Sequence, residues 1–464
     1  MAGLLSVLRQ GAQSLQAQQA YSSTVAQNLS NANTPGYARQ RAELAAVVPA
    51  DQLGNSFLGR GVMLQAITQS RDRFVEQQVP VALGNEARSS TQATLLQGVS
   101  ALNPDAGLSD SLAAFYSQLR ALAQNPGSAS VREAAVSAAK RLATSFNQTA
   151  SALDAARGAV DARLEGTLPE LNEALAQVAK LNAQISQATG AGGRPNDLLD
   201  ARARLVDRVA TLTGARVVEN DVGDANLVLP GGTSLVQGDK AATFSAQPDP
   251  ANNGNLALWL RSPSSIAAKQ LGEVPGGTLG GMLDARDGAM RTAQQRVDTL
   301  ASDLAGAVNA VAQTGFTLTG TTGQKVFSVQ ATVAGAARTL SVDAALAANG
   351  ALFPAAGVAG APGDATIAQR LIDTEGQALS SGRSPGDELA SLTASYGAAT
   401  SRAMAMAEGD GAVKLNLETM RQSASGVSID EELVNMQRSQ RAYEAVARVI
   451  KTADQMLETL LGLR

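Results

Sequence analysis

Cysteine and histidine are both absent from this sequence of 464 residues. Without cysteine the chain has no disulfides, no thiol catalysis and no cysteine-based metal site. Without histidine it lacks the most frequent general base and the most frequent metal ligand. Carboxylates and lysines remain, but they form no convergent acid–base or metal-binding set in the sequence. We therefore predict that the protein is not an enzyme and has no catalytic residue, no metal and no cofactor.

Aromatic residues are scarce as well, at 3% of the chain against 44% for hydrophobic residues as a whole. Alanine, leucine and valine must then supply most of the packing, which favours helical bundles because alanine and leucine are good helix formers. The 44 glycines, with many serines, threonines and asparagines, indicate strand-rich or loop-rich parts as well. The length predicts roughly two to four domains.

Neither a charge excess nor a long apolar run is present. The formal net charge is −4, without a basic run or a basic stripe with aromatics, so we expect no nucleic-acid partner. No window approaches the roughly 18 uninterrupted apolar residues of a membrane span. The N-terminal stretch lacks the basic region and continuous apolar core of a secretory signal. Composition alone thus predicts a cytoplasmic protein, or one that leaves the cytoplasm without a cleaved signal.

Both ends of the chain are predicted to be long helices with apolar side chains at three- and four-residue spacing. The face opposite the stripe in residues 4–29 carries almost no charge, although solvated helices normally carry charged pairs there. We expect the two helices to pair as a coiled-coil-like domain. An ordinary amphipathic helix within its own domain is the alternative. The residues expected on the packing faces are Leu4, Leu8, Leu15, Val25, Leu29, Ile429, Leu433, Met436, Tyr443, Ile450, Leu457 and Leu460.

The C-terminal helix begins with an acidic cluster. Ser428 and Glu431 have the spacing of a capping box, in which the glutamate reaches back to the helix start. Asp430 and Glu432 place negative charge at the positive end of the helix. Catalytic carboxylates are the competing interpretation, but the electrostatics of the helix start explains the cluster better.

The stretch "LSNANTPGYARQ", residues 29–40, ends the first helix abruptly. Asparagine tolerates the left-handed conformation that ends helices, and a residue before proline avoids the helical region. A Pro-Gly pair suits the two central positions of a type II turn, and the following residues alternate as an extended segment. We predict a rigid joint made of Asn31, Asn33, Thr34, Pro35, Gly36 and Tyr37.

The middle of the chain alternates between helical and strand-like patterns. Helices are expected between about 70 and 213, with a break near Gly166 to Pro169 and with Asn196 as a helix cap. Residues 215–278 predict short antiparallel strands. The next helical segment starts with glycines, but it lacks the Gly-Lys-Ser/Thr of a phosphate loop. The block 315–395 predicts weak strands, and helix returns after about 396.

These patterns together predict a mainly α, multidomain α+β fold with inserted β domains. Residues 1–60 and 420–464 are expected to form a terminal-helix domain with the exit segment. A helical-bundle domain is expected over 61–214, 279–314 and 396–419, and an antiparallel β domain over 215–278. Residues 315–395 are expected to form an outer segment rich in strands or loops.

Several stretches in this order resemble the axial proteins of the bacterial flagellum. "NLSNANTPGYARQ" resembles a stretch shared by rod, hook and hook-associated proteins, and its ending is closest to the hook-associated protein 1 family. "GRGVMLQAITQSRDRFVEQQV", "PNDLLDARARLVDRV" and "GGTLGGMLDARD" are also similar to that family. So is the C-terminal "SGVSIDEELVNMQRSQRAYEAVARVIKTADQMLETLLGL". The resemblance covers roughly residues 1–313 and 396–464, while 315–395 carry no matching motif.

The resemblance implies a structural protein of the hook–filament junction. It implies export through the flagellar type III apparatus without signal cleavage, then axial self-assembly as a ring in the extracellular flagellum. The terminal helices would form the innermost tube, surrounded by the bundle and then by β domains. Implied partners are other copies of the chain, the hook protein, the second junction protein and an export chaperone. The chaperone would cover the C-terminal segment at Leu433, Ile450, Leu457 and Leu460.

Two other interpretations of the function remain open. Another flagellar axial protein (hook, rod or second junction protein) is the nearest, although the long helical middle and the C-terminal block argue against it. A secreted coiled-coil scaffold or adhesin is the more distant alternative.

Overall fold

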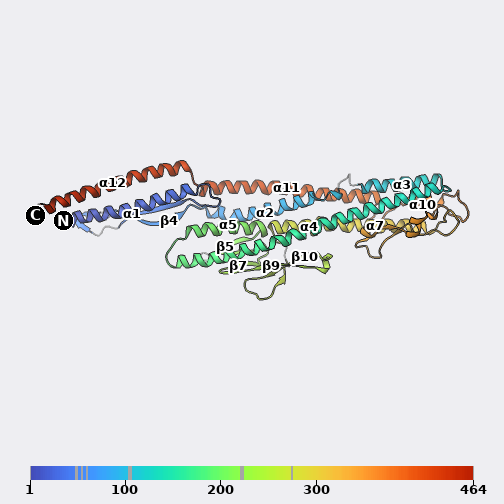
Figure 1. The fold of residues 1–464 in the computed structure, drawn as a ribbon, viewed down its shortest axis with the longest axis horizontal. Helices are drawn as coiled ribbons and strands as arrows, with labels where there is room; N and C mark the ends of the chain where they lie inside the picture. The colour runs from blue at the N-terminus through green and yellow to red at the C-terminus, as the bar shows by residue number, and fades with distance from the viewer. Residues whose placement is uncertain are drawn as a thin grey trace.

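The computed structural model describes residues 2–47, 51–53, 56–58, 61–102, 107–219, 224–272 and 275–462. The molecule is elongated, with both termini at one end and most strands gathered on one side (Figure 1). Long helices dominate and the sheets are small and antiparallel, which confirms the predicted mainly α fold with inserted β parts. Among the described helices, none combines the length and hydropathy that a membrane crossing requires.

The two ends of the chain lie together. Helix α1 (Ala2–Ser30) and helix α12 (Ile429–Gly462) run side by side, as predicted (Figure 1). Strands β1 (Gln40–Ala46) and β4 (Val62–Gln69) form an antiparallel pair beside α1, from Gln40 with Gln69 to Ala46 with Val62, and the register shifts between Glu43 and Leu44. This pair confirms the extended segment expected after the joint. The connection between the strands carries a short hairpin of β2 (Asp51–Leu53) and β3 (Ser56–Leu58).

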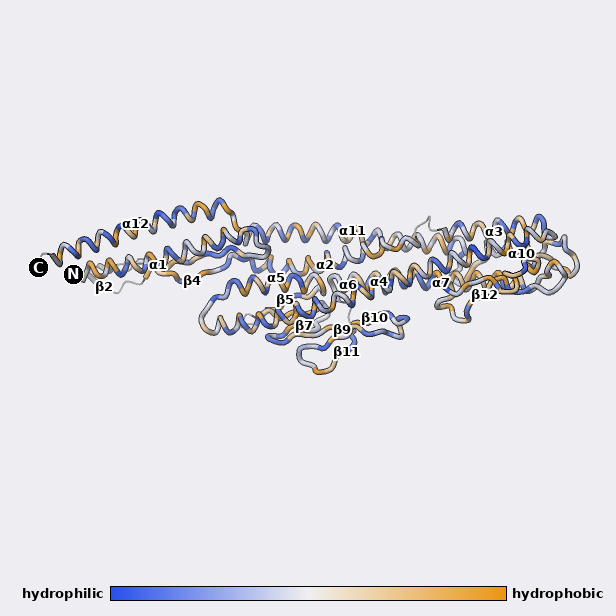
Figure 2. The backbone as a smooth tube through the Cα atoms, viewed as in Figure 1, coloured by the Kyte–Doolittle hydropathy of each residue, from blue (hydrophilic) through white to orange (hydrophobic). Residues whose placement is uncertain are grey.

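The contact between α1 and α12 is made largely by small and polar residues. Gly11 lies so close to α12 that a Cβ atom there would be 2.5 Å from Cγ1 of Ile450. The hydroxyls of Ser22 and Ser439 share a hydrogen bond across the same contact. Hydrophobic residues recur along both helices with hydrophilic ones between them (Figure 2). The pair is therefore close but buries little apolar surface.

A bundle of long helices forms the body of the molecule. Asp72 caps the first of them by accepting hydrogen bonds from the backbone N–H groups of Phe74 and Val75. A π-helical segment, η3, joins two of the helices without a break. The helices are α2 (Arg73–Gln97), α3 (Leu108–Gln124), α4 (Ala129–Gly190), α5 (Asn196–Thr213), α6 (Gly277–Leu283), η3 (Asp284–Met290), α7 (Arg291–Ala312) and α11 (Pro385–Ser425), with the short turn η1 (Ser100–Leu102).

Helix α4 corrects one prediction. It runs for 62 residues, about 90 Å, straight through the expected break, with Pro169 inside the helix. Proline removes one helical hydrogen bond, which favours a break when nothing else intervenes. Here Leu164, Leu168 and Leu171 on one face are buried in a hydrophobic core. Burial on both sides of the proline keeps the helix continuous, because tertiary packing overrides local propensity.

The strands expected over 215–278 are present. They form one four-stranded sheet in the order β5-β6-β7-β8 and one three-stranded sheet in the order β11-β10-β9. Their inward side chains share a hydrophobic core with α4 and α5. The strands are β5 (Arg216–Glu219), β6 (Ala225–Val228), β7 (Ser234–Gln237), β8 (Lys240–Ala241), β9 (Thr243–Pro248), β10 (Leu256–Arg261) and β11 (Lys269–Gln270), with the turn η2 (Pro250–Asn252).

The block 315–395 packs on the end of the bundle away from the termini (Figure 1). Phe327 and Phe353 of this block are buried in one hydrophobic core with Phe115 of α3. Before Pro385 its elements are short: β12 (Phe327–Ser328), α8 (Ala336–Thr339), β13 (Ser341–Val342), α9 (Ala344–Ala348), η4 (Gly350–Leu352) and α10 (Thr366–Asp373). Helix α11 begins at Pro385, so helix returns earlier than the predicted position of about 396. The division of the chain into domains remains a prediction.

Candidate functional site at the helix joint

The turn that follows α1 has the predicted geometry. The Tyr37 N–H donates to the Thr34 carbonyl at 3.2 Å, and Gly36 has a φ of +74°. A positive φ at this position defines a type II turn and favours glycine. A Cβ atom on Gly36 would also lie 2.6 Å from Cγ of Arg204 on α5. The joint thus places its glycine directly against the bundle.

The two asparagines of the joint do not adopt the predicted left-handed conformation. Among the described residues, Asn253 is the one non-glycine residue with a positive φ, so the prediction for Asn31 and Asn33 was wrong. The side-chain amide of Asn31 instead donates to the backbone carbonyl four residues earlier, at 3.0 Å. Its oxygen accepts from the Thr34 hydroxyl at 3.2 Å. These bonds close the last turn of α1, so no left-handed residue is needed there.

Asn28, one turn before the joint, holds the start of β1 against α1. Its side chain is 1% exposed and bonds both backbone groups of Gln40, donating to the carbonyl at 2.8 Å and accepting from the N–H at 2.9 Å. The Tyr37 hydroxyl donates to the same Asn28 oxygen at 2.9 Å. Burial, followed by the charge of Asp200, raises the pKa of Tyr37, so the phenol remains protonated as this donor.

Arg39 connects the joint to the start of α12. Its Nη2 lies 2.6 Å from Oε1 of Glu432, and its Nη1 lies 2.9 Å from Glu431. Burial opposes the charge on Arg39, but the hydrogen bonds and charges of these glutamates raise its pKa overall. Glu432 is 1% exposed and also accepts from the Asn28 amide at 3.2 Å. One buried carboxylate therefore joins both terminal helices and the exit segment, by which we mean residues 38–46 between the turn and the end of β1.

This arrangement corrects the predicted capping box. The Ser428 hydroxyl accepts from the Glu431 N–H at 3.5 Å, as such a box requires. The Glu431 side chain, however, binds Arg39 instead of reaching back. The exit segment brings the Arg39 guanidinium to the start of α12, so the Glu431 side chain forms an ion pair with Arg39 in place of the capping contact.

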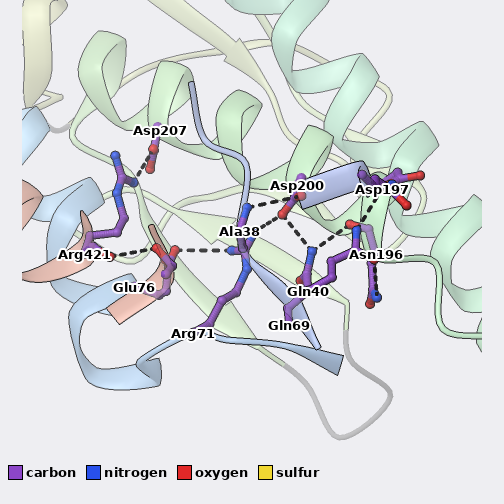
Figure 3. A network of polar contacts seen from close by, with 12 residues as sticks. Ala38, Gln40, Gln69, Arg71, Glu76, Asn196, Asp197, Asp200, Asp207 and Arg421 are labelled. Carbon is purple, nitrogen blue, oxygen red and sulfur yellow. Dashed lines mark hydrogen bonds and ion pairs between the residues drawn. The ribbon is translucent and has the colours of Figure 1, made fainter. Parts of the chain in front are cut away.

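On its other side the exit segment is bonded to α5 (Figure 3). Asp200 forms an ion pair with Arg71 and accepts from the Gln69 amide at 2.8 Å. It also accepts from the Ala38 N–H at 3.4 Å. Arg71 reaches Glu76 of α2 at 3.4 Å as well. Asp200 therefore ties the first residues after the turn and the end of β4 to the bundle.

Helix α11 joins the same network. Arg421 donates to Asp207 of α5 at 2.8 Å (Figure 3). The Arg39 N–H donates to the Ser425 carbonyl at 2.9 Å, so the end of α11 is also held by the exit segment. Burial raises the pKa of Asp207, against the opposing charge of Arg421. Burial likewise raises the pKa of Asp200.

Asn196 has a different role from the one predicted. It begins α5 without a side-chain capping bond. Its amide donates to the Ile67 carbonyl at 3.0 Å and to the side-chain oxygen of Gln40 at 3.4 Å. Neighbouring β strands compete successfully for this side chain, so the cap prediction was wrong.

Sequence reasoning missed most of the residues that form the network. Asn28, Arg39, Asp200 and Asp207 were not singled out, although they lie within quoted stretches. One signal was available, because Asp200 and Asp207 are seven residues apart and so share one face of a predicted helix. The partners of these carboxylates come from distant segments, which spacing along the chain does not reveal.

The predicted packing residues of the terminal helices fall into three groups. Val25 is buried. Seven are half-buried: Leu4, Leu8, Leu15, Leu29, Met436, Ile450 and Leu457. Four are exposed: Ile429, Leu433, Tyr443 and Leu460. Their role in assembly remains a prediction.

The joint acts by fixing the conformation of the backbone. A polar cavity of about 250 Å³ lies beside it, lined by the Pro35–Gly36 turn and by charged side chains of α2, α5 and α11. The charged groups there are largely paired with one another. Within the described part of the chain, no group of three or more metal-binding side chains is placed to hold an ion.

Comparison with known families identifies matches in two parts of the chain. The model described as "Flagellar hook-associated protein FlgK helical domain" matches residues 96–327, half of the chain. The model described as "Flagellar basal body rod FlgEFG protein C-terminal" matches residues 421–463.

Similar proteins and a similar structure are also known. Flagellar hook-associated protein 1 of Salmonella typhimurium is 26% identical, over 99% of this chain and 100% of that protein. The Bacillus subtilis protein of the same name is 26% identical, over 97% of this chain and 96% of that protein. The structure of the flagellar hook junction protein FlgK from Burkholderia pseudomallei has a TM-score of 0.68 at 18% identity, covering 75% of this chain and 100% of that one.

Proposed function

Because the chain belongs to the flagellar hook-associated protein FlgK family, we propose that it forms the hook–filament junction, with its joint fixing the terminal helices to the bundle. The family membership makes it a structural component of the extracellular flagellum that assembles with other flagellar proteins. It confirms the resemblance found in the sequence. We assign no catalytic role to any residue.

One observation carries the proposal for the joint. Glu432, at the start of α12, binds both Asn28 of α1 and Arg39 of the exit segment. The exit segment in turn is bonded to α5 through Asp200. Any displacement of the terminal helices relative to the bundle must break buried polar contacts, and a broken buried pair is costly.

The proposal places the parts of the chain in the assembled structure. Residues 1–60 and 420–464 form the inner tube with other copies. The bundle segments 61–214, 279–314 and 396–419 surround the tube. The β domain of 215–278 and the block 315–395 lie outside. The neighbours along the axis are the hook protein and the second junction protein.

Export precedes assembly in this proposal. The chain passes through the flagellar type III apparatus unfolded or partly folded, without signal cleavage. A dedicated chaperone covers the C-terminal segment beforehand, because Leu433 and Leu460 are exposed there and Ile450 and Leu457 are half-buried. Deletion of residues 430–464 should abolish binding of the export chaperone in a pull-down. Undiminished binding to the truncated chain would refute the chaperone site.

Complementation tests the function as a whole. The gene encoding this chain should be deleted in its own host and then restored on a plasmid. Electron microscopy of the deleted cells should show intact hooks without filaments, and restoration should return the filaments. Filaments of normal number and length in the deleted cells would contradict a junction role.

A further inference from the structure

Helix α11 carries a second packing face that no part of the described chain covers. Its covered face, with Leu417, packs against α2. A neighbouring face has apolar residues seven apart, at Met406, Val413 and Met420, exposed by 61%, 54% and 44%. A seven-residue spacing keeps these side chains in one row along about 21 Å of helix. We call this row, with the positions between its members at three- and four-residue spacing, the α11 seam: Met406, Gly409, Val413, Asn416 and Met420.

The α11 seam has the composition of a helix-packing surface. None of its five residues is charged; Asp410 lies beside the row between Met406 and Val413, and Glu408, Lys414 and Glu418 occupy other positions on the same helix. Apart from the adjoining residues and backbone of α11, no described atom lies within 4 Å of where a Cβ atom on Gly409 would be, so the seam is open at its narrowest residue. Rows of apolar residues interrupted by a small one allow a second helix to approach closely.

The C-terminal half of the seam borders a shallow groove. The groove has a volume of about 610 Å³ and lies between α11 and the start of α2. Asn416 and Met420 of the seam line one wall, and the other is lined by Val75 of α2 and by Asp72, which caps that helix. A partner that packs on the seam can therefore insert side chains beside Met420 instead of resting on a flat surface.

We propose that the α11 seam is a contact with a neighbouring copy of this chain in the assembled junction, an inference that rests on the proposed function. A helix is the element that fits, because the seam repeats with the period of helix packing. The seam is a surface of the bundle and lies apart from the terminal helices. It thus extends the contact between copies outward from the tube.

Two observations favour a second copy as the occupant. Only residues 426–428 separate α11 from α12, and the two helices follow each other along one edge of the molecule (Figure 1). A neighbour placed against the exposed face of α12 is then positioned to continue along α11. The five seam residues also carry no charge, so a second copy, which has the same formal net charge of −4, meets no like charge from them.

Photo-crosslinking in assembled flagella tests the proposal. The chain is expressed in the complemented host with a photoreactive benzoyl-phenylalanine at position 413, and isolated hook–filament structures are irradiated. A matched variant carries the same group at Glu408, on the same helix but off the seam. The expected result is an adduct of twice the chain mass at position 413, at least five-fold stronger than at position 408. Mass spectrometry of the adduct identifies the partner.

A charge variant adds an independent readout. Met406→Asp with Val413→Asp should leave the melting temperature of the purified chain within a few degrees, because both side chains are exposed. It should reduce junction assembly at least ten-fold. The matched control, Glu408→Lys, also alters charge on α11 and should assemble normally.

The outcomes separate the two proposals. If the unmodified chain does not restore filaments, the proposed function fails and this inference fails with it. If it restores filaments but the adduct at position 413 contains another protein, or the aspartate variant assembles as well as the control, only the inference is overturned.

Discussion

Two residues of the joint network, Asn28 and Glu432, make polar contacts while almost fully buried. Asn28 bonds both backbone groups of Gln40 and so takes the place of a strand partner. Glu432 is almost fully buried and depends on Arg39 for compensation of its charge. Removing one partner of a buried ion pair commonly costs about 3–5 kcal/mol, because the other charge stays buried. The joint is therefore sensitive to substitutions that would be mild on the surface.

Asp207 gives the joint a pH dependence that can be tested. Burial raises its pKa in the folded chain above the ordinary aspartate value of about 3.9. The folded state thus takes up this proton at a higher pH than the unfolded state does. Protonation of Asp207 therefore stabilises the folded chain. This stabilisation is complete at a pH below the pKa of the unfolded state, and it is lost as pH rises through the pKa of the folded state.

The Asp207→Asn variant has no titratable carboxyl at this position, so it serves as the reference for the wild type. As pH is lowered from 7 toward the ordinary aspartate value of about 4, the melting temperature of the wild type should improve relative to that of the variant. Calorimetry at several pH values measures the difference. A difference that is constant, or that moves toward the variant on acidification, would show that the carboxyl does not titrate as described.

At the scale of elements, the pairing of α1 with α12 depends on close approach more than on buried apolar area. Gly11 sits against Ile450 with no room for a side chain. The hydroxyls of Ser22 and Ser439 meet further along the contact. Several large apolar side chains of α12 remain exposed, so the pair in a single chain is held by contacts at small residues and by the joint. Neighbouring copies are the proposed source of the remaining burial.

A substitution at Gly11 tests this view of the pair. Gly11→Leu should push α12 away and weaken the pairing by about 1–3 kcal/mol, the usual cost of overpacking. Limited proteolysis should then cut the terminal helices several-fold faster while the bundle stays resistant. Gly158→Leu on α4 is the matched control, since no described atom lies within 4 Å of its Cβ position. Equal cleavage rates in the two variants would argue against a tight contact.

Elements that depend on residues close together in the sequence could be predicted, whereas those that depend on distant segments could not. The type II turn at Pro35–Gly36 and the pairing of the terminal helices were predictable, because turn chemistry and apolar spacing are local signals. The unbroken course of α4 through Pro169 was not, because burial of leucines by distant segments decides it. The same holds for the joint: Asp200 draws its partners from segments more than a hundred residues earlier in the chain.

At the scale of the whole molecule, the joint acts at one end of a long lever. The terminal helices lie at one end of the structure, and the bundle with α4 extends far beyond it (Figure 1). A tilt of about 5° at the joint would displace the far end of a 62-residue helix, about 90 Å long, by roughly 8 Å. An assembly of many copies would accumulate such errors. Buried ion pairs on both sides of the exit segment are a physical means of preventing them.

The most direct test of this account is electron microscopy of cells that express Arg39→Ala in place of the wild-type chain. Arg41→Ala is the matched control, because Arg41 is exposed on β1 two residues away. The account predicts that Arg39→Ala is exported in normal amounts but leaves most hooks without filaments, whereas Arg41→Ala supports normal filaments. Filaments equal in number and length on cells with Arg39→Ala would contradict the claim that the joint fixes the terminal helices to the bundle.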